Sequence, residues 1–424
     1  MDQTPSPFAQ SPSGGTFELV SSDAGGGDLP SRGSCCTACG SRTLSDIFHS
    51  KAQPVCVGTV CDTAEEARRA PTADITLAYC HACGLVFNRI FDIEQVGFKP
   101  GYEVALNHSP VFCDFISGVA DRLVERFDLR GKTVLEIGCG GGYFLRLLAE
   151  RGGNHGIGID PTVPREGIER LEEGKVEFIR DFFGDQHRNI ATDFVCCLSV
   201  FEAIPRPIEL LRTLRRMLAE RPQVPLYFEV FNAFRAIEQQ ETWSIHYEQC
   251  NYFSLESLTA LFRRSGFEVT GAGTCYQGDQ YLYVEALPAT IDTSEESPEQ
   301  RVRANELPAD VARFAASYTE NVKAWQHRLN EFARQQQRVV VWGTGGKGIG
   351  FLNTLDTTVA IDYVIEINPD KQGRFVPGSA QQIMPLEFLT EYRPDKVIIT
   401  NALYRDEMQQ QARQLGVNPE FIIA

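Results

Sequence analysis

The stretch VLEIGCGGGYF, residues 134–144, decides the fold because it reads as a strand, a glycine-rich turn and the start of a helix. Glycines such as Gly138 and Gly140 permit positive φ angles and let the backbone approach a ligand closely. Glu136 precedes the turn, and Asp160 ends the next strand-like segment, GIGID, about 20 residues further on. An acidic side chain there can accept hydrogen bonds from ribose hydroxyls. The pattern predicts a nucleotide-type ligand at one edge of a β/α sheet.

Strand-like and helix-like segments alternate on both sides of this turn, from about residue 109 to about residue 287. The stretches VEFI, FVCCLSV and LYFEVF read as strands, and PIELLRTLRRMLAE reads as a helix. A polar linker near 288–299 and a packing helix lead to a second β/α run that begins at RVVVWGTGGKG, residues 338–348. Such alternation predicts helices on both faces of a mostly parallel sheet. We therefore predict an α/β chain with two Rossmann-like domains, at 109–287 and 288–424.

The N-terminal part divides into a leader and a cysteine-rich module. Residues 1–33 are rich in Gly, Ser, Pro and Asp, and we expect them to be disordered because they cannot bury enough apolar surface. Residues 34–108 contain two CxxC pairs, each followed by glycine, formed by Cys36, Cys39, Cys80 and Cys83. Two such turns can surround one ion with four thiolates, so we predict a closed, structural zinc site.

The composition excludes several classes of function. The 424 residues include 40 Lys and Arg against 56 Asp and Glu, a formal net charge of −16, and an acidic surface repels nucleic acid. No run approaches the roughly 18 apolar residues of a membrane span, and no signal-peptide pattern is present. The sequence predicts a soluble cytoplasmic protein, a monomer or weak homo-oligomer, that acts on a small molecule.

The first glycine turn, with its acidic strand end, resembles motifs I and II of class I S-adenosylmethionine (SAM) methyltransferases. The resemblance implies a class I methyltransferase fold in which Glu136, Gly138, Gly140 and Asp160 line the SAM site. Asp181, after the strand VEFIR, is the expected partner of the adenine amine, with Phe182 stacking beside it. A dinucleotide site and a turn without ligand are the alternatives.

The whole chain after the leader resembles the sugar C-methyltransferases that act on nucleotide-linked 4-keto-deoxyhexoses. The most specific stretches are CTACG with CHACGLVF, LEIGCGGGYFL, YEQCNYFSLESL, and VVVWGTGGKGIGFLNTL with IDYVIEINPDKQGRFVPG. The resemblance implies SAM-dependent C-methylation of a nucleotide-linked keto-sugar or a related secondary-metabolite intermediate. Two alternatives stay open: an O-, N- or C-methyltransferase for a non-sugar molecule, and a catalytically silent SAM-binding scaffold.

The residues expected to remove a proton depart from this family. Its members have an arginine-histidine pair and a Glu-His pair after the fourth strand, and a Tyr-His-Glu-His run before Tyr-Phe-Ser. Here Ser199 and Ala203 replace the two histidines, while Glu202 is kept. Gln249 stands at the position of the base histidine, and an amide cannot take a proton at neutral pH. The family's base therefore cannot be carried over.

Four residues are our candidates to replace the family's base, namely Tyr102, His246, Tyr247 and Glu248. In one interpretation, His246 or Tyr247 transfers the proton and Glu248 orients it. Tyr102, in GYEVALNHSPVF, lies in a segment that resembles a family segment whose tyrosine lines the active site. In a second interpretation the acceptor is already activated, so that a weak base is enough.

The second glycine turn, GTGGKG at residues 343–348, matches GxGxxG, and Glu366 ends the next strand. Alone, this pattern indicates a dinucleotide site, and NAD binding is a minor possibility. Within the family resemblance, the turn belongs to a domain that helps to hold the nucleotide-linked substrate between the two β/α domains. We predict Lys347, Gln280 and Tyr252 as substrate-binding residues, with Lys347 placed at a helix start to meet phosphate. A purely structural turn is the alternative.

Overall fold

The computed structural model describes residues 33–102, 106–289 and 307–424. The predicted leader at 1–33 lies almost wholly outside these residues. The glycine turn at 138–142 follows β4 (Thr133–Ile137), and β4 lies inside an eight-stranded sheet with the order β11-β12-β9-β8-β4-β5-β7-β6. The turn therefore sits at the carboxyl end of a central strand, as its sequence predicts.

This sheet is mostly parallel. Its other strands are β5 (His155–Ile159), β6 (Gly167–Arg170), β7 (Lys175–Ile179), β8 (Phe194–Leu198), β9 (Leu226–Phe231), β11 (Phe267–Cys275) and β12 (Tyr281–Pro288). Strands β4, β5, β7, β8 and β9 are parallel, whereas β12 is antiparallel to both β9 and β11, and β6 is antiparallel to β7. Because β4 pairs with β5 on one side and β8 on the other, its carboxyl end is a topological switch point, where such sheets bind ligands.

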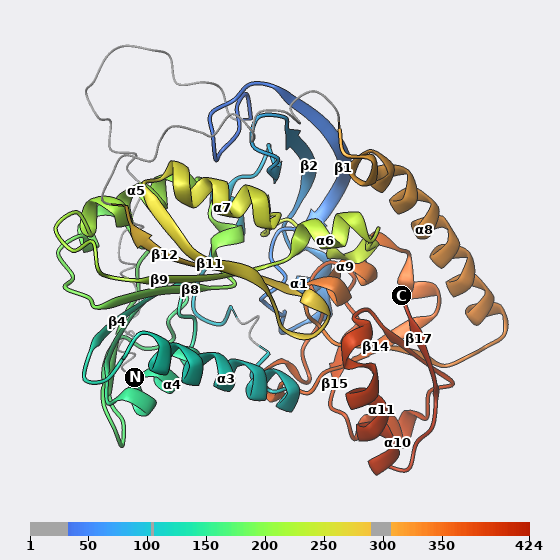
Figure 1. Cartoon of the computed structure of the whole chain (residues 1–424). Coiled ribbons are helices and arrows are strands. Elements are labelled where there is room, and N and C mark those ends of the chain that lie inside the picture. Colours follow the sequence, from blue (N-terminus) through green and yellow to red (C-terminus); the bar gives the residue numbers. More distant parts are fainter. Residues whose placement is uncertain (1–32, 103–105, 290–306) are drawn as a thin grey trace, which may run out of the picture. The chain divides into compact units, whose positions relative to one another are not determined.

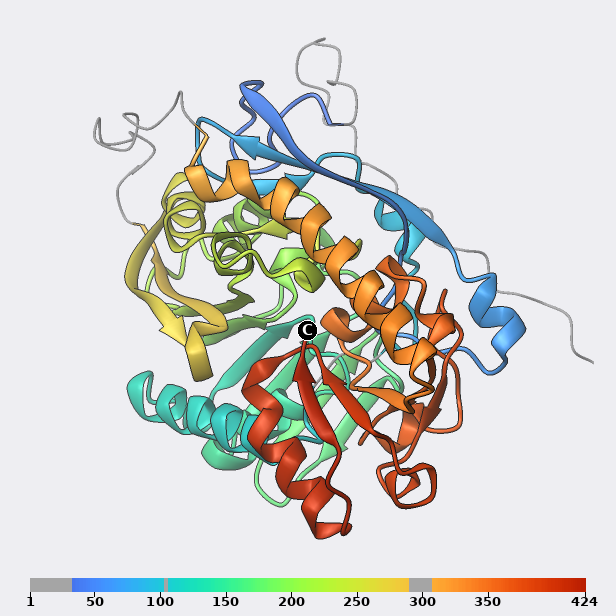
Figure 2. The same cartoon turned by 90° about the vertical axis from the view of Figure 1, so that its right-hand side faces the viewer.

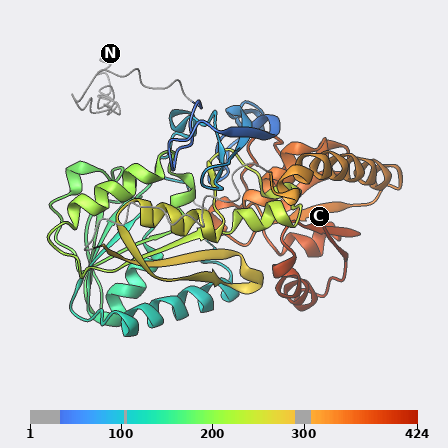
Figure 3. The same ribbon diagram turned by 45° about the horizontal axis from the view of Figure 1, so that its top comes forward.

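Helices cover both faces of the sheet (Figures 1 and 3). They are α3 (Pro110–Arg126) and α4 (Tyr143–Gly152) on one face, and α5 (Pro207–Met217) and α7 (Leu255–Arg264) on the other. Along β4 the side chains alternate, so Val134 packs with α3 and α4, and Leu135 packs with α5 and α7. Ser109 caps α3 and is followed by Pro110, which suits the first helical turn.

The cysteine-rich module forms a four-stranded antiparallel sheet with the order β1-β2-β3-β10. Its strands are β1 (Leu44–Pro54), β2 (Thr72–Cys80), β3 (Val86–Asn88) and β10 (Asn251–Tyr252), and it carries α1 (Ala64–Arg68) and α2 (Ile93–Val96). Strand β10 belongs to the middle of the chain and begins two residues after the candidate catalytic segment 246–249. The sheet of the module therefore holds the chain just after that segment.

The C-terminal part is a five-stranded parallel sheet with the order β15-β14-β13-β16-β17. Its elements are β13 (Val339–Trp342), α9 (Gly346–Thr354), β14 (Ile361–Ile365), β15 (Gln382–Met384), α10 (Phe388–Tyr392), β16 (Lys396–Ile399), α11 (Arg405–Gln414) and β17 (Glu420–Ile423). The long helix α8 (Ala309–Arg334) precedes them and runs along β1 (Figure 2), where the rings of Phe314 and Phe48 lie 5.7 Å apart.

The strands and helices named from the sequence are all present. The structure adds others that were not named, among them the strands of the N-terminal module, the helices α3, α7 and α11, and the short elements β6, β15 and α6 (Ala233–Glu238). Among the described residues, no helix combines the length and apolar character that crossing a membrane requires.

Candidate active site

Gly138 and Gly140 of the first glycine turn have different surroundings. Gly138 has φ +75°, and a Cβ there would come within 2.4 Å of Val200, so the position needs glycine for packing. Gly140 has φ +51°, but a Cβ there would meet nothing within 4 Å. Its outer side is therefore open, as a turn that receives a ligand requires.

Asp160 holds the turn from the end of β5. Its Oδ2 accepts a hydrogen bond from the Gly140 N–H at 2.9 Å, and its Oδ1 accepts two from Thr162, both at 2.6 Å. An ionised carboxylate offers about four acceptor sites, so one site on Oδ2 is left for a further donor. The geometry is compatible with the predicted contact to a ribose hydroxyl.

Glu136 is buried beneath the turn without a full set of partners. Its side chain is 3% exposed, and Oε2 has no hydrogen-bond partner in the structure. Burial, together with the nearby Asp160 charge, raises the pKa of Glu136 to about 8. An orphaned carboxyl oxygen of this kind fits a ligand that brings a positive charge or a hydrogen-bond donor, and SAM carries both.

The predicted adenine partners follow β7. Oδ1 of Asp181 accepts from the Phe182 N–H at 2.8 Å, and its Oδ2 accepts from Nε2 of Gln186 at 3.1 Å. The ring of Phe182 is 38% exposed, which suits stacking against a base. The structure brings both residues to the same edge of the sheet as Asp160.

Tyr102 and Glu248 meet, although 146 positions separate them in the sequence. The Tyr102 hydroxyl donates to Oε1 of Glu248 at 3.0 Å, and the Val57 N–H donates to Oε2 at 3.0 Å. Burial raises the pKa of Glu248 to about 7. A Cβ at Gly58 would lie 2.3 Å from the Tyr102 ring, so this glycine makes room for the tyrosine. The cysteine-rich module therefore contributes to the site through residues that the sequence reading had passed over.

His246 and Tyr247 point to different surroundings. Burial and the nearby Lys347 charge lower the pKa of His246 to about 4, so its ring is neutral, and its buried Nδ1 has no partner. Tyr247 is 1% exposed, and its hydroxyl accepts from the Asp92 N–H at 2.9 Å while its ring lies against Phe91. These contacts give Tyr247 a place in the core of the cysteine-rich module, so we leave it out of the proposed machinery.

The three predicted substrate-binding residues have different roles in the structure. Tyr252 is fully buried and donates to the His246 carbonyl at 3.3 Å, so it supports that segment from inside the core. Gln280 accepts from Asn401 at 3.0 Å, and its buried Nε2 has no partner. Lys347 donates to Glu241 at 2.6 Å. Its ammonium group already has a carboxylate partner, so the expected phosphate contact gains no support.

Glu202, which the sequence analysis noted as kept but did not list as a site residue, is buried, and Glu229 on the neighbouring strand is equally buried but is not assigned to the site. Glu202 follows β8 in the 3₁₀ turn Phe201–Ala203, and Glu229 lies in β9. Burial raises the pKa of each to about 7. The signal was available, because each interrupts an apolar run. Ser199, between β8 and Glu202, has φ +53°, a strained value for serine that often accompanies function.

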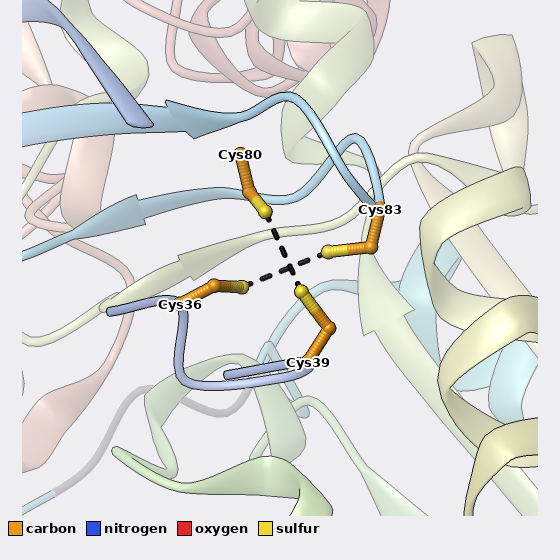
Figure 4. Close-up of side chains that lie close together, drawn as sticks. All are labelled: Cys36, Cys39, Cys80 and Cys83. Atoms are coloured by element: carbon orange, nitrogen blue, oxygen red, sulfur yellow. Dashed lines mark hydrogen bonds between the residues drawn. The ribbon is translucent and has the colours of Figure 1, made fainter. Parts of the chain in front are cut away.

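The four predicted cysteines converge on one point (Figure 4). The sulfurs of Cys36 and Cys83 are 3.6 Å apart, those of Cys39 and Cys80 are 3.5 Å apart, and all four lie within 4.8 Å of one another. A tetrahedral ion with metal–sulfur bonds of about 2.3 Å requires sulfurs about 3.8 Å apart, so the donor set fits zinc. The glycine after each CxxC has a positive φ, +74° at position 40 and +73° at position 84.

The second glycine turn is packed in part against the rest of the chain. Oε2 of Glu366 accepts from the N–H and hydroxyl of Thr344, and its Oε1 accepts from two further main-chain N–H groups. Helix α9 lies against the segment 241–246: a Cβ at Gly346 would come within 3.0 Å of the His246 ring, and one at Gly350 within 2.9 Å of the Trp243 carbonyl. Gly346, Gly348 and Gly350 therefore serve close packing, whereas a Cβ at Gly343 or Gly345 would meet nothing within 4 Å.

Comparisons with known proteins match this architecture. Residues 112–271 match the model of a methyltransferase domain, and residues 289–424 match that of a C-methyltransferase C-terminal domain. The chain is 24% identical over 389 residues to the C-methyltransferase NovU of Streptomyces niveus, an alignment that covers 88% of this chain and 90% of that protein.

Other relatives match a smaller part. The ubiquinone biosynthesis O-methyltransferase of Hahella chejuensis is 32% identical over 151 residues, which is 34% of this chain and 57% of that protein. A solved magnesium protoporphyrin IX methyltransferase from Synechocystis PCC 6803 is 18% identical, covers 41% of this chain and 78% of its own, and has a TM-score of 0.30. The two domain matches and the nearly full-length relative agree: the chain is a SAM-dependent C-methyltransferase that joins a methyltransferase domain to a C-methyltransferase C-terminal domain.

Proposed function

We propose that the chain methylates a carbon next to the carbonyl of a nucleotide-linked keto-sugar. The motifs that resemble the sugar C-methyltransferases and the C-terminal domain support the substrate class. One observation carries the proposal further: five buried polar atoms of the residues considered for the site have no protein partner, namely Oε2 of Glu136, Oε2 of Glu202, Nδ1 of His246, Nε2 of Gln249 and Nε2 of Gln280. Buried polar groups normally have partners, so this set calls for a polar ligand.

The donor side of the site is assigned to the first glycine turn. We assign SAM to Glu136, Gly138, Gly140 and Asp160, with Asp181 and Phe182 at the adenine. When bound, SAM supplies an electrophilic methyl group on a cationic sulfur. The residues of the chain align the acceptor carbon with that methyl group, and such alignment contributes much of the acceleration.

On the acceptor side, Tyr102 is assigned to contact the sugar, and Glu248 to hold its hydroxyl in place. Both Glu248 oxygens already accept protein hydrogen bonds, so Glu248 is a positioning residue. Gln280 is assigned to the acceptor through its unpartnered amide nitrogen, and the neutral His246 through its unpartnered Nδ1. We also propose that the protein is cytoplasmic and is a monomer or a weak homo-oligomer.

The proposal is tested by incubating the purified protein with SAM and a series of nucleotide-linked keto-sugars. Mass spectrometry then detects the gain of one methyl group. The matched control is the same nucleotide sugar with its carbonyl reduced to a hydroxyl, which lacks an acidic α-proton and should stay unmodified. Methylation of that alcohol, or only of phenols or amines, would replace this proposal with O- or N-methylation. Tight SAM binding without turnover of any acceptor would favour the scaffold.

We also propose zinc as the ion of the four-cysteine centre. The ion would supply folding energy for the module that carries Val57 and pairs β3 with β10, and it would take no part in the chemistry. Elemental analysis should find about one zinc per chain, lost in Cys39→Ser. Cys35→Ser is the matched control, because Cys35 lies outside the cluster. Another metal at equal stoichiometry, or none, contradicts the assignment.

A further inference from the structure

Glu202 presents one unused carboxylate oxygen at the carboxyl end of β8. Its Oε1 accepts from the Phe231 N–H at 3.1 Å, which fixes the carboxylate from β9. Its Oε2 is buried and has no hydrogen-bond partner, and the side chain is 7% exposed. A carboxylate that is fixed through one oxygen and has no partner at the other can act as a general base.

The surroundings of Glu202 favour its proton affinity. The titratable groups that face it are Cys197 on β8, Glu229 on β9, Cys250 beside β10 and Tyr281 on β12, and none of them is a cation. Within the described parts of the chain, Glu202 forms no ion pair. Burial raises its pKa to about 7, so the carboxylate is a stronger base than an exposed one and is still largely ionised just above neutral pH.

Gln249 offers the complementary group. Its side chain is 4% exposed, and Nε2 is buried without a partner. The next residue, Cys250, donates its N–H to the Glu202 carbonyl at 3.1 Å, so the two segments lie side by side. An amide NH₂ is a hydrogen-bond donor, and proton removal next to a carbonyl needs a donor at the oxygen where negative charge develops.

We propose that Glu202 removes the proton from the carbon to be methylated and that Gln249 donates a hydrogen bond to the resulting enolate oxygen. In this step the C–H bond breaks, the proton forms an O–H bond with Oε2 of Glu202, and the electron pair moves into the enolate. The enolate carbon then bonds to the methyl group of SAM while the carbon–sulfur bond breaks and its electron pair stays on sulfur. The proton leaves Glu202 to solvent. This assignment rests on the proposed function.

Other candidate bases are less suited to this step. Both oxygens of Glu248 accept protein hydrogen bonds, and Oε2 of Glu229 accepts from the Tyr227 hydroxyl at 3.1 Å. Burial and the Lys347 charge lower the pKa of His246 to about 4, which makes its ring a weak base. Glu202 combines a free oxygen, burial and a raised pKa.

The experiment separates proton removal from methyl transfer. The enzyme is incubated with a nucleotide keto-sugar and S-adenosylhomocysteine in deuterated water, and exchange at the α-carbon is followed by mass spectrometry. Glu202→Gln should lower both exchange and methylation by about 10²- to 10⁴-fold, because general-base catalysis contributes that much. Gln249→Ala should lower both by about 10²-fold through loss of the oxyanion donor. SAM affinity should stay within about twofold in both variants, which also shows that they fold.

The matched control is Glu229→Gln, an equally buried glutamate whose pKa is also raised to about 7. It should keep exchange and methylation within about tenfold of the wild type. The wild-type rate should also rise with pH through about 7, and Glu202→Gln should lose that rise. Wild-type exchange in Glu202→Gln overturns the assignment and leaves the proposed function standing. A larger loss in Glu229→Gln than in Glu202→Gln also overturns it. A wild type that neither exchanges nor methylates any keto-sugar overturns the proposed function as well.

Discussion

The chain contains two glycine-rich turns of similar local construction that differ in how fully their buried carboxylates are hydrogen-bonded. Each follows a central parallel strand, β4 or β13, and each is held by a carboxylate from the end of the next strand. Asp160 accepts from the Gly140 N–H at 2.9 Å, and Glu366 accepts from the Thr344 N–H at 3.0 Å. The difference between them lies in what surrounds the turn.

The carboxyl groups at the first turn have oxygens without a full set of hydrogen-bond partners. Asp160 has three protein donors and Glu366 has four, which is about the number a carboxylate can accept. Glu136, two residues before the first turn, has an orphaned oxygen, whereas the equivalent position before the second turn is the fully buried Val341. The second turn is instead packed against the segment 241–246. A glycine motif therefore permits close approach, and the chain itself makes that approach at Gly346 and Gly350 of the second motif and its helix.

The largest expected effect is a loss of SAM affinity on removal of Asp160 at the first turn but not of Glu366 at the second. Asp160→Ala should weaken SAM binding by about 100-fold, because the one acceptor site left for a ribose hydroxyl is on a charged group, and such a hydrogen bond contributes up to about 3 kcal/mol. Glu366→Ala removes the equivalent residue of the second turn and should leave SAM affinity within about twofold. Isothermal titration calorimetry measures both. Equal losses would show that the two turns are not functionally different.

The next effect tests whether the second turn is built for packing. A Cβ at position 348 would lie 2.2 Å from the Gly343 carbonyl oxygen, a rigid backbone atom. Gly348→Ala should lower the free energy of unfolding by about 2 kcal/mol and Tm by about 4–8 °C. Gly345→Ser is the control, since a Cβ there meets nothing and serine is a favourable N-cap for α9. Differential scanning calorimetry that finds both variants equally stable would contradict tight packing.

A smaller effect tests the buried carboxyl of the first turn. The pKa of Glu136 is raised to about 8, so at pH 7 its carboxyl is mostly protonated. A cationic ligand favours the ionised form, so binding releases a proton and SAM affinity should rise with pH, by up to about tenfold per unit below pH 8. Glu136→Gln should abolish that slope. Titrations in two buffers with different ionisation enthalpies count the released protons, and the same slope in the variant would exclude Glu136.

The smallest effect concerns the ion pair between Lys347 of the second turn and Glu241. Lys347 and Glu241 form a half-buried ion pair at 2.6 Å. Lys347→Met and Glu241→Gln should each lower stability by about 1 kcal/mol and leave KM for the nucleotide substrate unchanged. If the lysine binds phosphate instead, only Lys347→Met should raise KM. Steady-state kinetics with both variants therefore decides between packing and substrate binding.

Local patterns were enough to predict much of the architecture. The alternation of strand and helix periods, the two glycine turns and the CxxC pairs each depend on residues close together in sequence, and the structure contains all of them. The N-terminal module was less predictable. Its sheet includes β10, which lies beyond residue 250, and a strand of two residues is too short to show an alternating apolar pattern.

The candidate site was predicted only in part. The first glycine turn follows from its glycines and acids, but Glu202 was noted only as kept and was not listed as a site residue, because its importance depends on burial and on its partners. Val57 reaches Glu248 across 191 positions, and Lys347 reaches Glu241 across 106. The sequence by itself determined the order of the elements and the residues at the two turns, since backbone period and φ preferences are local. Only the tertiary structure decided which glycines pack against other segments and which carboxylate keeps a free oxygen, because both depend on which distant segments lie against them.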